Sequence, residues 1–287
     1  MKVVLLITVC SQNITRIQNQ ISNLKKNQPV NEIELIPIFV FGTSSLPTPN
    51  TDPYIKLKMP VEEKYTNLYF KLFHAYRYIH EKVDYDFIWK IDDDTLINPQ
   101  FLDSNMLRGY DYIGRLTTSN TYMNMSIEAD IYGEKKKIYL IPECLNSGIT
   151  FASGDSYFLS KRAVDTIVSK SVIIDLIKTF NRIPEDRLFG FMLSYNKSLV
   201  YKNISKTDKI IEVNKLQVTE NYLSIHPINE NIFSDLIYKT PQEQISEIII
   251  HRYTHLDKRQ AYLTDLENRL MKTFTDFLNE KKDLGLC

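Results

Sequence analysis

The sequence has few cysteines, few glycines and no excess of charge of either sign. Its 287 residues include three Cys, at positions 10, 144 and 287, together with 8 Gly and a single Trp. Three scattered cysteines are too few for a disulfide framework or a zinc site, which favours a reducing compartment. With so little glycine and 11% aromatic residues, the chain does not have a low-complexity or linker composition. We therefore expect it to fold throughout.

The charge balance and the apolar runs exclude further classes of protein. Lys plus Arg and Asp plus Glu number 35 each, so the formal net charge is zero, which disfavours nucleic acid as the main partner. No run reaches the ~18 to 20 apolar residues that span a bilayer, so we predict no transmembrane segment. The opening MKVVLLITVC is short and lacks a small-residue cleavage site, so we interpret it as a buried strand rather than a signal peptide.

Strand-like and helix-like patterns alternate in the first hundred residues. Apolar runs at 2–10, 34–41 and 86–91 are typical of strands covered on both faces, and 54–57 could form a further short strand. Helices are expected at 14–26 and 62–83, the second because its apolar residues are spaced three and four apart. A chain of this length with this alternation predicts one α/β domain with a doubly wound, mostly parallel sheet flanked by helices.

The second half of the chain is more mixed. Strands are expected at 112–116, 137–141 and 156–159. Helices are expected at 161–169 and 185–194. A charged amphipathic stretch at 257–282 predicts a C-terminal helix, which we interpret as a cap on the domain rather than as a partner-binding helix.

Three consecutive aspartates, Asp92, Asp93 and Asp94, directly follow the apolar run 86–91. Ligands of doubly wound sheets bind beyond the carboxyl ends of strands, where these carboxylates are expected. Three adjacent carboxylates repel one another and need a cation, a basic partner or full hydration. Alternation along an extended chain puts Asp92 and Asp94 on one side, where their hard oxygens suit Mn²⁺ or Mg²⁺. The alternative is a solvated acidic turn.

The aspartates belong to a series of four sequence motifs. The stretch at 63–102, EKYTNLYFKLFHAYRYIHEKVDYDFIWKIDDDTLINPQFL, contains Tyr-x-Asn-Leu-x-x-Lys and Lys-x-Asp-Asp-Asp-x-x-x-Asn. These two motifs are formed by Tyr65, Asn67, Leu68 and Lys71 and by Lys90, Asp92, Asp93, Asp94 and Asn98. Ser-Gly-x-x-Tyr-x-x-Ser follows at 153–160 and Glu-Asp-x-x-x-Gly at 185–190. In motif content and order, the sequence resembles the fringe and β-1,3-galactosyltransferase family over 63–190.

This resemblance implies a GT-A fold, a divalent metal and sugar transfer with inversion of the anomeric carbon. By position in the motif, Asp94 would coordinate the metal, and Asp92 and Asp93 would contact the nucleotide, its ribose or groups around the metal, with Asp92 also a candidate metal ligand. Asp186 corresponds to the general base, which an inverting transfer needs because the attacking acceptor hydroxyl must lose its proton. The alternative role for Glu185 and Asp186 is to cap a helix that follows Pro184.

The family also implies a histidine ligand downstream of the base. His226 ends an apolar, strand-like run and is our candidate for this ligand. His251 also follows an apolar run and is the alternative. A structural, hydrogen-bonded imidazole remains an alternative for either residue.

Further candidates for donor binding come from the first strand and the later motifs. GT-A enzymes commonly lay the nucleobase across the end of the first strand, which points to Val9 and Ser11. Ser153 and Gly154 would bring main chain close to the donor sugar or the acceptor, because glycine lacks a Cβ, or would form an ordinary turn. The remaining candidates are Lys71 and Lys90, which could balance diphosphate or aspartate charge, and Glu185.

Two features differ from luminal members of the family. The sequence shows no membrane anchor, and Ala152 stands where a cysteine usually precedes Ser-Gly. We therefore expect a cytoplasmic protein, and the Asn-, Ile- and Lys-rich composition points to an AT-rich microbial or viral genome.

Together these features lead to one hypothesis with three alternatives. We expect a single GT-A-like domain over 1–287, with a nucleotide-sugar-binding half at 1–110, an acceptor half at 111–240 and a C-terminal helical extension at 241–287. It would transfer a hexose or N-acetylhexosamine from a UDP-sugar to a hydroxyl of a glycan acceptor. The alternatives are a retaining glycosyltransferase, a nucleotidyltransferase, and a catalytically silent carbohydrate-binding or scaffold protein.

Overall fold

A computed structural model describes residues 1–29, 32–44, 46–119, 126–131, 134–139, 149–171, 184–204, 210–212, 224–226, 230–240 and 243–244. Contacts divide the chain into two units, Met1–Tyr238 and Lys239–Cys287. All helices and strands named below belong to the first unit. The helix expected at 257–282 lies outside the described residues.

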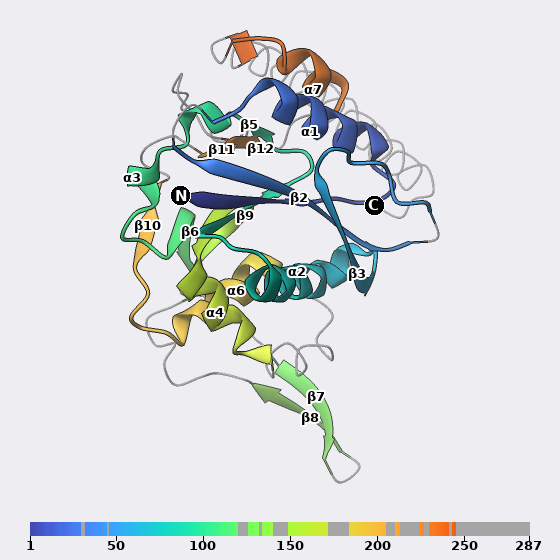
Figure 1. Ribbon diagram of the computed structural model, residues 1–287. Coiled ribbons are helices and arrows are strands. Elements are labelled where there is room, and N and C mark those ends of the chain that lie inside the picture. The colour runs from blue at the N-terminus through green and yellow to red at the C-terminus, as the bar shows by residue number, and fades with distance from the viewer. Residues whose placement is uncertain are drawn as a thin grey trace, which may run out of the picture. The chain divides into compact units, whose positions relative to one another are not determined.

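A seven-stranded sheet forms the centre of the first unit (Figure 1), in the order β10-β6-β9-β4-β1-β2-β3. Its strands are β1 (Lys2–Thr8), β2 (Glu34–Thr43), β3 (Ile55–Glu62), β4 (Phe87–Asp92), β6 (Tyr112–Ser119), β9 (Ile149–Ser160) and β10 (Tyr201–Asn203). Strand β9 runs antiparallel to both of its neighbours, and all other neighbouring pairs are parallel. A mixed α/β fold with a mostly parallel sheet is thus confirmed.

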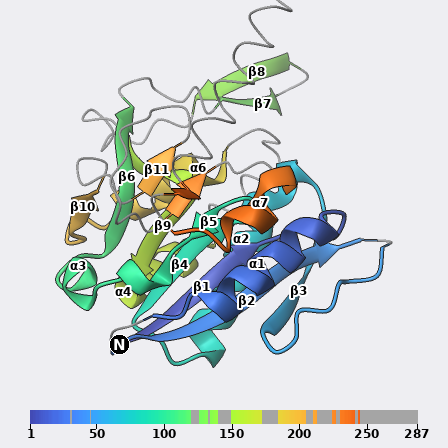
Figure 2. The ribbon, with the colours of Figure 1, turned by 90° about the horizontal axis from the view of Figure 1, so that it is seen from above.

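Helices cover both faces of this sheet. Figures 1 and 2 show α1 lying over β1 and β2 on one face, and α2, α4 and α6 on the other. The helices are α1 (Ile14–Lys26), α2 (Leu68–Lys82), α3 (Ser104–Leu107), α4 (Lys161–Val168), α6 (Glu185–Ser194) and α7 (Glu230–Leu236), with single turns η1 (Tyr65–Asn67) and η2 (Pro99–Phe101). Among the residues described, no helix combines the length and the apolar character needed to cross a membrane.

The apolar run at the start of the chain forms a central strand because both of its faces are buried. Val4 and Leu6 of β1 join the hydrophobic core under α2, α4 and α6, whereas Leu5 and Ile7 join the core under α1. All four side chains are fully buried. A strand covered on both sides has no polar face, which explains the continuous run of Val, Leu and Ile.

Smaller elements complete the described part of the chain. A three-stranded sheet contains β5 (Leu96–Ile97), β11 (Ile210–Glu212) and β12 (Ser224–His226), and β7 (Ser126–Ile131) pairs with β8 (Glu134–Tyr139) as a hairpin.

The helix predicted at 62–83 begins later than expected. Strand β3 continues to Glu62, and the Glu63 N–H donates to the Thr43 carbonyl of β2, so the backbone here takes part in sheet pairing. The helix α2 therefore begins only at Leu68, after the turn η1.

Candidate active site

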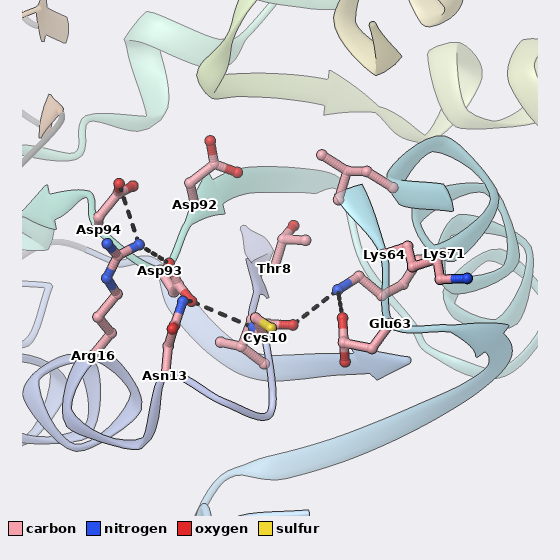
Figure 3. A pocket seen from close by; sticks show the side chains of 12 residues that line it. Thr8, Cys10, Asn13, Arg16, Glu63, Lys64, Lys71, Asp92, Asp93 and Asp94 are labelled. Carbon is pink, nitrogen blue, oxygen red and sulfur yellow. Dashed lines mark hydrogen bonds and ion pairs between the residues drawn. The ribbon is translucent and has the colours of Figure 1, made fainter. Parts of the chain in front are cut away.

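A pocket of about 410 Å³ lies where the carboxyl ends of β1 and β4 meet (Figure 3). The two strands are parallel neighbours, and their register places Thr8 opposite Asp92. Strand β4 therefore delivers the three aspartates beside the loop that leads from β1 to α1, as expected for a doubly wound sheet. The pocket is lined by Thr8, Val9, Cys10, Asn13, Arg16, Glu63, Lys64, Leu68, Lys71, Asp92, Asp93 and Asp94.

Asp93 ties the end of β4 to the start of α1. Its carboxylate accepts hydrogen bonds from the Cys10 N–H at 3.4 Å and from Asn13 Nδ2 at 3.3 Å, and it pairs with Arg16 Nη1 at 3.1 Å. Burial raises the pKa of Asp93, and the hydrogen bonds from Arg16 and Asn13 oppose that rise. The middle aspartate thus has protein partners that fix the loop between β1 and α1.

Asp92 and Asp94 keep part of their carboxylates accessible. Their side chains are 30% and 19% exposed, against 9% for Asp93. Asp92 Oδ1 accepts a hydrogen bond from Lys90 Nζ at 2.7 Å, and Asp94 Oδ2 lies 3.5 Å from Arg16 Nη1. Figure 3 shows Asp93 turned toward Cys10 and Asn13, away from the direction of Asp92 and Asp94.

The two accessible carboxylates fit a hard divalent cation as partial ligands. Mg²⁺ is commonly held by one or two carboxylates, with substrate phosphates and water as the remaining ligands. Among the described side chains, no group of three or more His, Cys, Asp or Glu could hold an ion without such additional ligands. The donor set therefore suits a cation that binds together with a phosphorylated ligand.

His226 lies on a strand beside the segment that leaves the aspartates. Strand β12 runs antiparallel to β5, with Ile225 opposite Leu96. Going on from Ile225, the chain of β12 runs toward the Asp94 end of β5, and the next residue is His226. The position of its side chain is not among the described features, and His251 lies outside the described residues.

Lys71 and Glu63 form a buried ion pair at the other end of the pocket. Lys71 Nζ donates to Glu63 Oε1 at 2.5 Å and to the Val9 carbonyl at 2.8 Å, and both charged side chains are less than a tenth exposed. Glu63 Oε2 accepts from the Gly42 N–H at 2.7 Å and from Ser11 Oγ at 3.4 Å. Val9 and Lys71 thus line the pocket, whereas Ser11 supports Glu63.

Lys90 connects strand β4 to helix α6. Its fully buried Nζ lies 2.7 Å from Asp92 Oδ1 and 3.1 Å from Glu185 Oε1, and it also donates to the Gly154 carbonyl. Burial alone would lower the pKa of Lys90, but Asp92 and Glu185 raise it above its ordinary value. Lys90 therefore stays charged and balances the carboxylates of Asp92 and Glu185.

The Ser-Gly element meets the start of α6 at this lysine. Both residues lie within β9, at a point where the register with β6 shifts, rather than in a turn between elements. A Cβ on Gly154 would lie 3.1 Å from each carboxylate oxygen of Glu185, so glycine permits this close approach. Ser153 Oγ accepts a hydrogen bond from Arg115 Nη2 at 2.9 Å.

Glu185 and Asp186 occupy the first turn of α6 in different environments. Glu185 is buried against Lys90, and burial raises its pKa to about 7 although Lys90 opposes the rise. Asp186 is partly exposed, and burial also raises its pKa. Asp186 Oδ1 accepts from the Arg187 N–H at 2.7 Å, as an acidic residue at a helix start can do.

The structure adds residues that the sequence did not single out. Asn13 and Arg16, one helical turn apart, reach from the β1–α1 loop and from α1 to the aspartates, and Glu63 anchors Lys71. One signal was available for the first two residues. A helix that follows a parallel strand begins at the carboxyl edge of the sheet, so its first turns face the site.

Part of the chain is similar in sequence to a known family. Residues 55–197 match the model of the family described as Galactosyltransferase. A comparison with curated proteins gives no match. The crystal structure of the apo-form glycosyltransferase GlyE from Streptococcus pneumoniae TIGR4 is similar over 88% of this chain, with 10% identity and a TM-score of 0.45. This chain spans 64% of that structure, less than two thirds of its length. The segment that carries the aspartates, the Ser-Gly element and the Glu-Asp element, just under half of the chain, is thus similar in sequence to the galactosyltransferase family.

Proposed function

We propose that this protein is an inverting glycosyltransferase that moves a hexose or N-acetylhexosamine from a UDP-sugar to a hydroxyl of a glycan acceptor. The observation that carries this proposal is the joining of two sites by one buried side chain. Asp92, which lines the pocket, and Glu185, which begins α6, both pair with Lys90. The match to the galactosyltransferase family covers both ends of this connection.

On the donor side, the chain provides a pocket with one apolar and one acidic end. Val9 and Leu68 lie at the end where Lys71 is neutralised by Glu63, which suits an uncharged nucleobase better than a phosphate. Asp92 and Asp94, with His226, would hold Mn²⁺ or Mg²⁺ at the acidic end. When bound, such a cation supplies the positive charge that stabilises a leaving diphosphate.

On the acceptor side, a carboxylate oxygen of Asp186 would take the proton of the attacking hydroxyl. The raised pKa of Asp186 makes this carboxylate a stronger base than an exposed aspartate. The ion pair between Lys90 and Glu185 would hold the first turn of α6, so that the base stays at a fixed place relative to Asp92. Proton removal and departure of the diphosphate would then occur at opposite sides of the anomeric carbon.

The first test measures nucleotide-sugar binding and turnover in the wild type and in Asp94→Ala. We expect UDP-sugars to raise the melting temperature only when Mn²⁺ is present, because a ligand that binds the native state stabilises it by roughly 2.7 kcal/mol at a hundred times its Kd. Asp94→Ala should keep the fold, lose this shift and lose metal-dependent turnover by a factor on the order of a hundred or more. The matched control is Asp84→Ala, whose exposed carboxylate pairs with Lys2.

The products separate the alternatives. Release of UDP with inverted anomeric configuration supports the proposal, retained configuration indicates a retaining transferase, and pyrophosphate indicates a nucleotidyltransferase. If no nucleotide sugar shifts the melting temperature in a metal-dependent way, a silent binding or scaffold protein is the better description. Full turnover by Asp94→Ala would refute the role of that aspartate.

A further inference from the structure

Arg16 brings a positive charge from α1 to two of the three aspartates. Its Nη1 lies 3.1 Å from Asp93 Oδ1 and 3.5 Å from Asp94 Oδ2, as the dashed lines in Figure 3 show. The Arg16 side chain is 30% exposed and lines the same pocket as Asp94. The guanidinium is therefore both an ion-pair partner and part of the pocket wall.

The charges around the aspartates are thus partly balanced by the chain itself. Lys90 pairs with Asp92, and Arg16 pairs with Asp93 and Asp94. A divalent cation at Asp94 would have to share that carboxylate with the guanidinium. Like charges a few ångströms apart repel each other, more strongly so beside a protein surface than in bulk water. Arg16 therefore opposes cation binding as long as it stays beside Asp94.

A nucleotide diphosphate would change this balance. Guanidinium groups bind phosphate oxygens through charge-assisted, often bidentate hydrogen bonds. A diphosphate in the pocket could accept hydrogen bonds from the guanidinium of Arg16. The guanidinium would then leave Asp94 Oδ2. Asp93 would not be left without partners, because Asn13 and the Cys10 N–H also donate to it.

We propose that Arg16 is an internal counter-ion that competes with the divalent cation for Asp94, so that tight cation binding requires the nucleotide diphosphate. This inference rests on the proposed function and adds that binding of the cation depends on binding of the nucleotide. The free protein binds the cation weakly, and the cation and the nucleotide each strengthen binding of the other by the same factor, as linkage requires. Arg16 is thus a positioning residue for the donor site.

The experiment measures Mn²⁺ binding by the loss of the electron paramagnetic resonance signal of free Mn²⁺, with and without UDP. In Arg16→Gln, we expect the Kd for Mn²⁺ without UDP to fall by at least about tenfold, which corresponds to about 1.4 kcal/mol. The factor by which UDP tightens Mn²⁺ binding should shrink in the same variant. Arg77→Gln is the control, because it removes an equal charge from an exposed pair with Glu81 on α2. It should change the Kd less than about twofold.

Two further variants keep the result open to contradiction. Thermal unfolding checks that Arg16→Gln is folded. If it is not, Arg16→Lys replaces it in the experiment, because the lysine ammonium lacks the forked N–H groups with which a guanidinium bridges two carboxylates. Arg16→Lys should tighten Mn²⁺ binding by a smaller factor. Adding Asp94→Asn to Arg16→Gln or to Arg16→Lys should abolish the increase in Mn²⁺ affinity.

The outcomes distinguish this inference from the function on which it rests. Tight Mn²⁺ binding by the wild type only with UDP, and by Arg16→Gln without it, supports the inference. An unchanged or weaker Mn²⁺ affinity in the Arg16 variants overturns it, while binding of UDP with Mn²⁺ to the wild type would leave the proposed function standing. Failure of every protein to bind Mn²⁺, even with UDP, overturns both.

Discussion

Lys90 and Glu185 are opposite charges held almost entirely away from water. Their side chains are 1% and 7% exposed, and they lie 3.1 Å apart between β4 and α6. Removing one member of such a pair leaves the other charge buried without compensation, which typically costs about 3 to 5 kcal/mol. Here Asp92 and the Gly154 carbonyl also face Lys90, so the lysine keeps partners when Glu185 is neutralised.

Glu185→Gln should change how stability depends on pH. The pKa of Glu185 is about 7 in the folded protein against 4.5 without perturbation, so the folded state binds an extra proton between these values. This group's contribution to stability therefore falls as the pH rises from about 4.5 to 7 and is constant above. Because Gln cannot ionise, the free energy of unfolding of the wild type minus that of the variant should drop by roughly 2 to 3 kcal/mol between pH 5 and pH 8.

Urea unfolding at both pH values checks this prediction. Glu81→Gln is the control, since it makes the same change at an exposed position on α2. A difference between wild type and Glu185→Gln that stays constant from pH 5 to pH 8 would contradict the assigned pKa shift.

At the scale of elements, the irregular course of β9 positions the groups around Lys90. The strand is antiparallel in a mostly parallel sheet, and its pairing with β6 moves from Tyr157 to Ala152 while β6 advances only from Gly114 to Leu116. Bulges of this kind bend a strand and change the direction in which its side chains point. Gly154 lies within the shifted stretch, and its carbonyl accepts from Lys90. At this bulge, Lys90 of β4 contacts both Gly154 of β9 and Glu185 of α6.

Gly190→Ala should loosen the packing of α6 on β9. A Cβ at this position would lie 2.5 Å from the Phe151 Cβ and 2.8 Å from the Thr150 carbonyl oxygen, so the helix would have to move away from the strand. We expect a loss of stability of about 1 to 3 kcal/mol, as for other overpacked sites. Turnover should fall as well, because Asp186 lies in the first turn of the same helix.

Chemical denaturation and steady-state kinetics measure the two effects. Ser194→Ala, a small change in the last turn of α6, is the control and should leave turnover unchanged. If Gly190→Ala is as stable as the wild type, the packing of α6 does not depend on the close approach of Gly190 to β9.

Single elements were predictable where their pattern is regular. The helices 14–26 and 185–194 have the bounds expected from the sequence, and β1 and β4 follow their apolar runs. Strand β9 was foreseen only at 156–159, because the small and polar residues Ser153, Gly154 and Asp155 interrupt the apolar pattern at the bulge. The two-residue strand β5 is too short to leave a periodic signal.

At the scale of the whole molecule, the fold was predictable and the site only in part. Alternating apolar runs determine which strands are central, and the aspartates fall at a strand end by the same reasoning. The approach of Arg16 to Asp94 and the meeting of Lys90 with Glu185 join residues far apart in the chain. Such contacts depend on how helices dock onto the sheet, which periodicity along one element does not contain.

The pocket also offers a chemical reporter of ligand binding. Cys10 is a free, partly exposed cysteine in the pocket lining, next to Asp93. In a Cys144→Ser/Cys287→Ser background, UDP with Mn²⁺ should slow alkylation of Cys10 by iodoacetamide at least about fivefold, because reaction requires access to the thiolate.

Mass spectrometry of the alkylated protein over time measures this protection. Free glucose, which lacks the nucleotide, is the control ligand and should leave the rate unchanged. If UDP with Mn²⁺ raises the melting temperature but leaves the alkylation rate of Cys10 unchanged, the nucleotide binds elsewhere.

The central position of β1 has a consequence for synthesis of the chain. Strand β1 is synthesised before both of its partners, β2 on one side and β4 on the other, so its second edge stays open until residue 92 has emerged. Strand β4 in turn waits for β9, which ends at Ser160. Unpaired strand edges template association with other chains. A nascent chain of this protein therefore exposes one edge of the apolar strand β1 throughout the synthesis of residues 9–92.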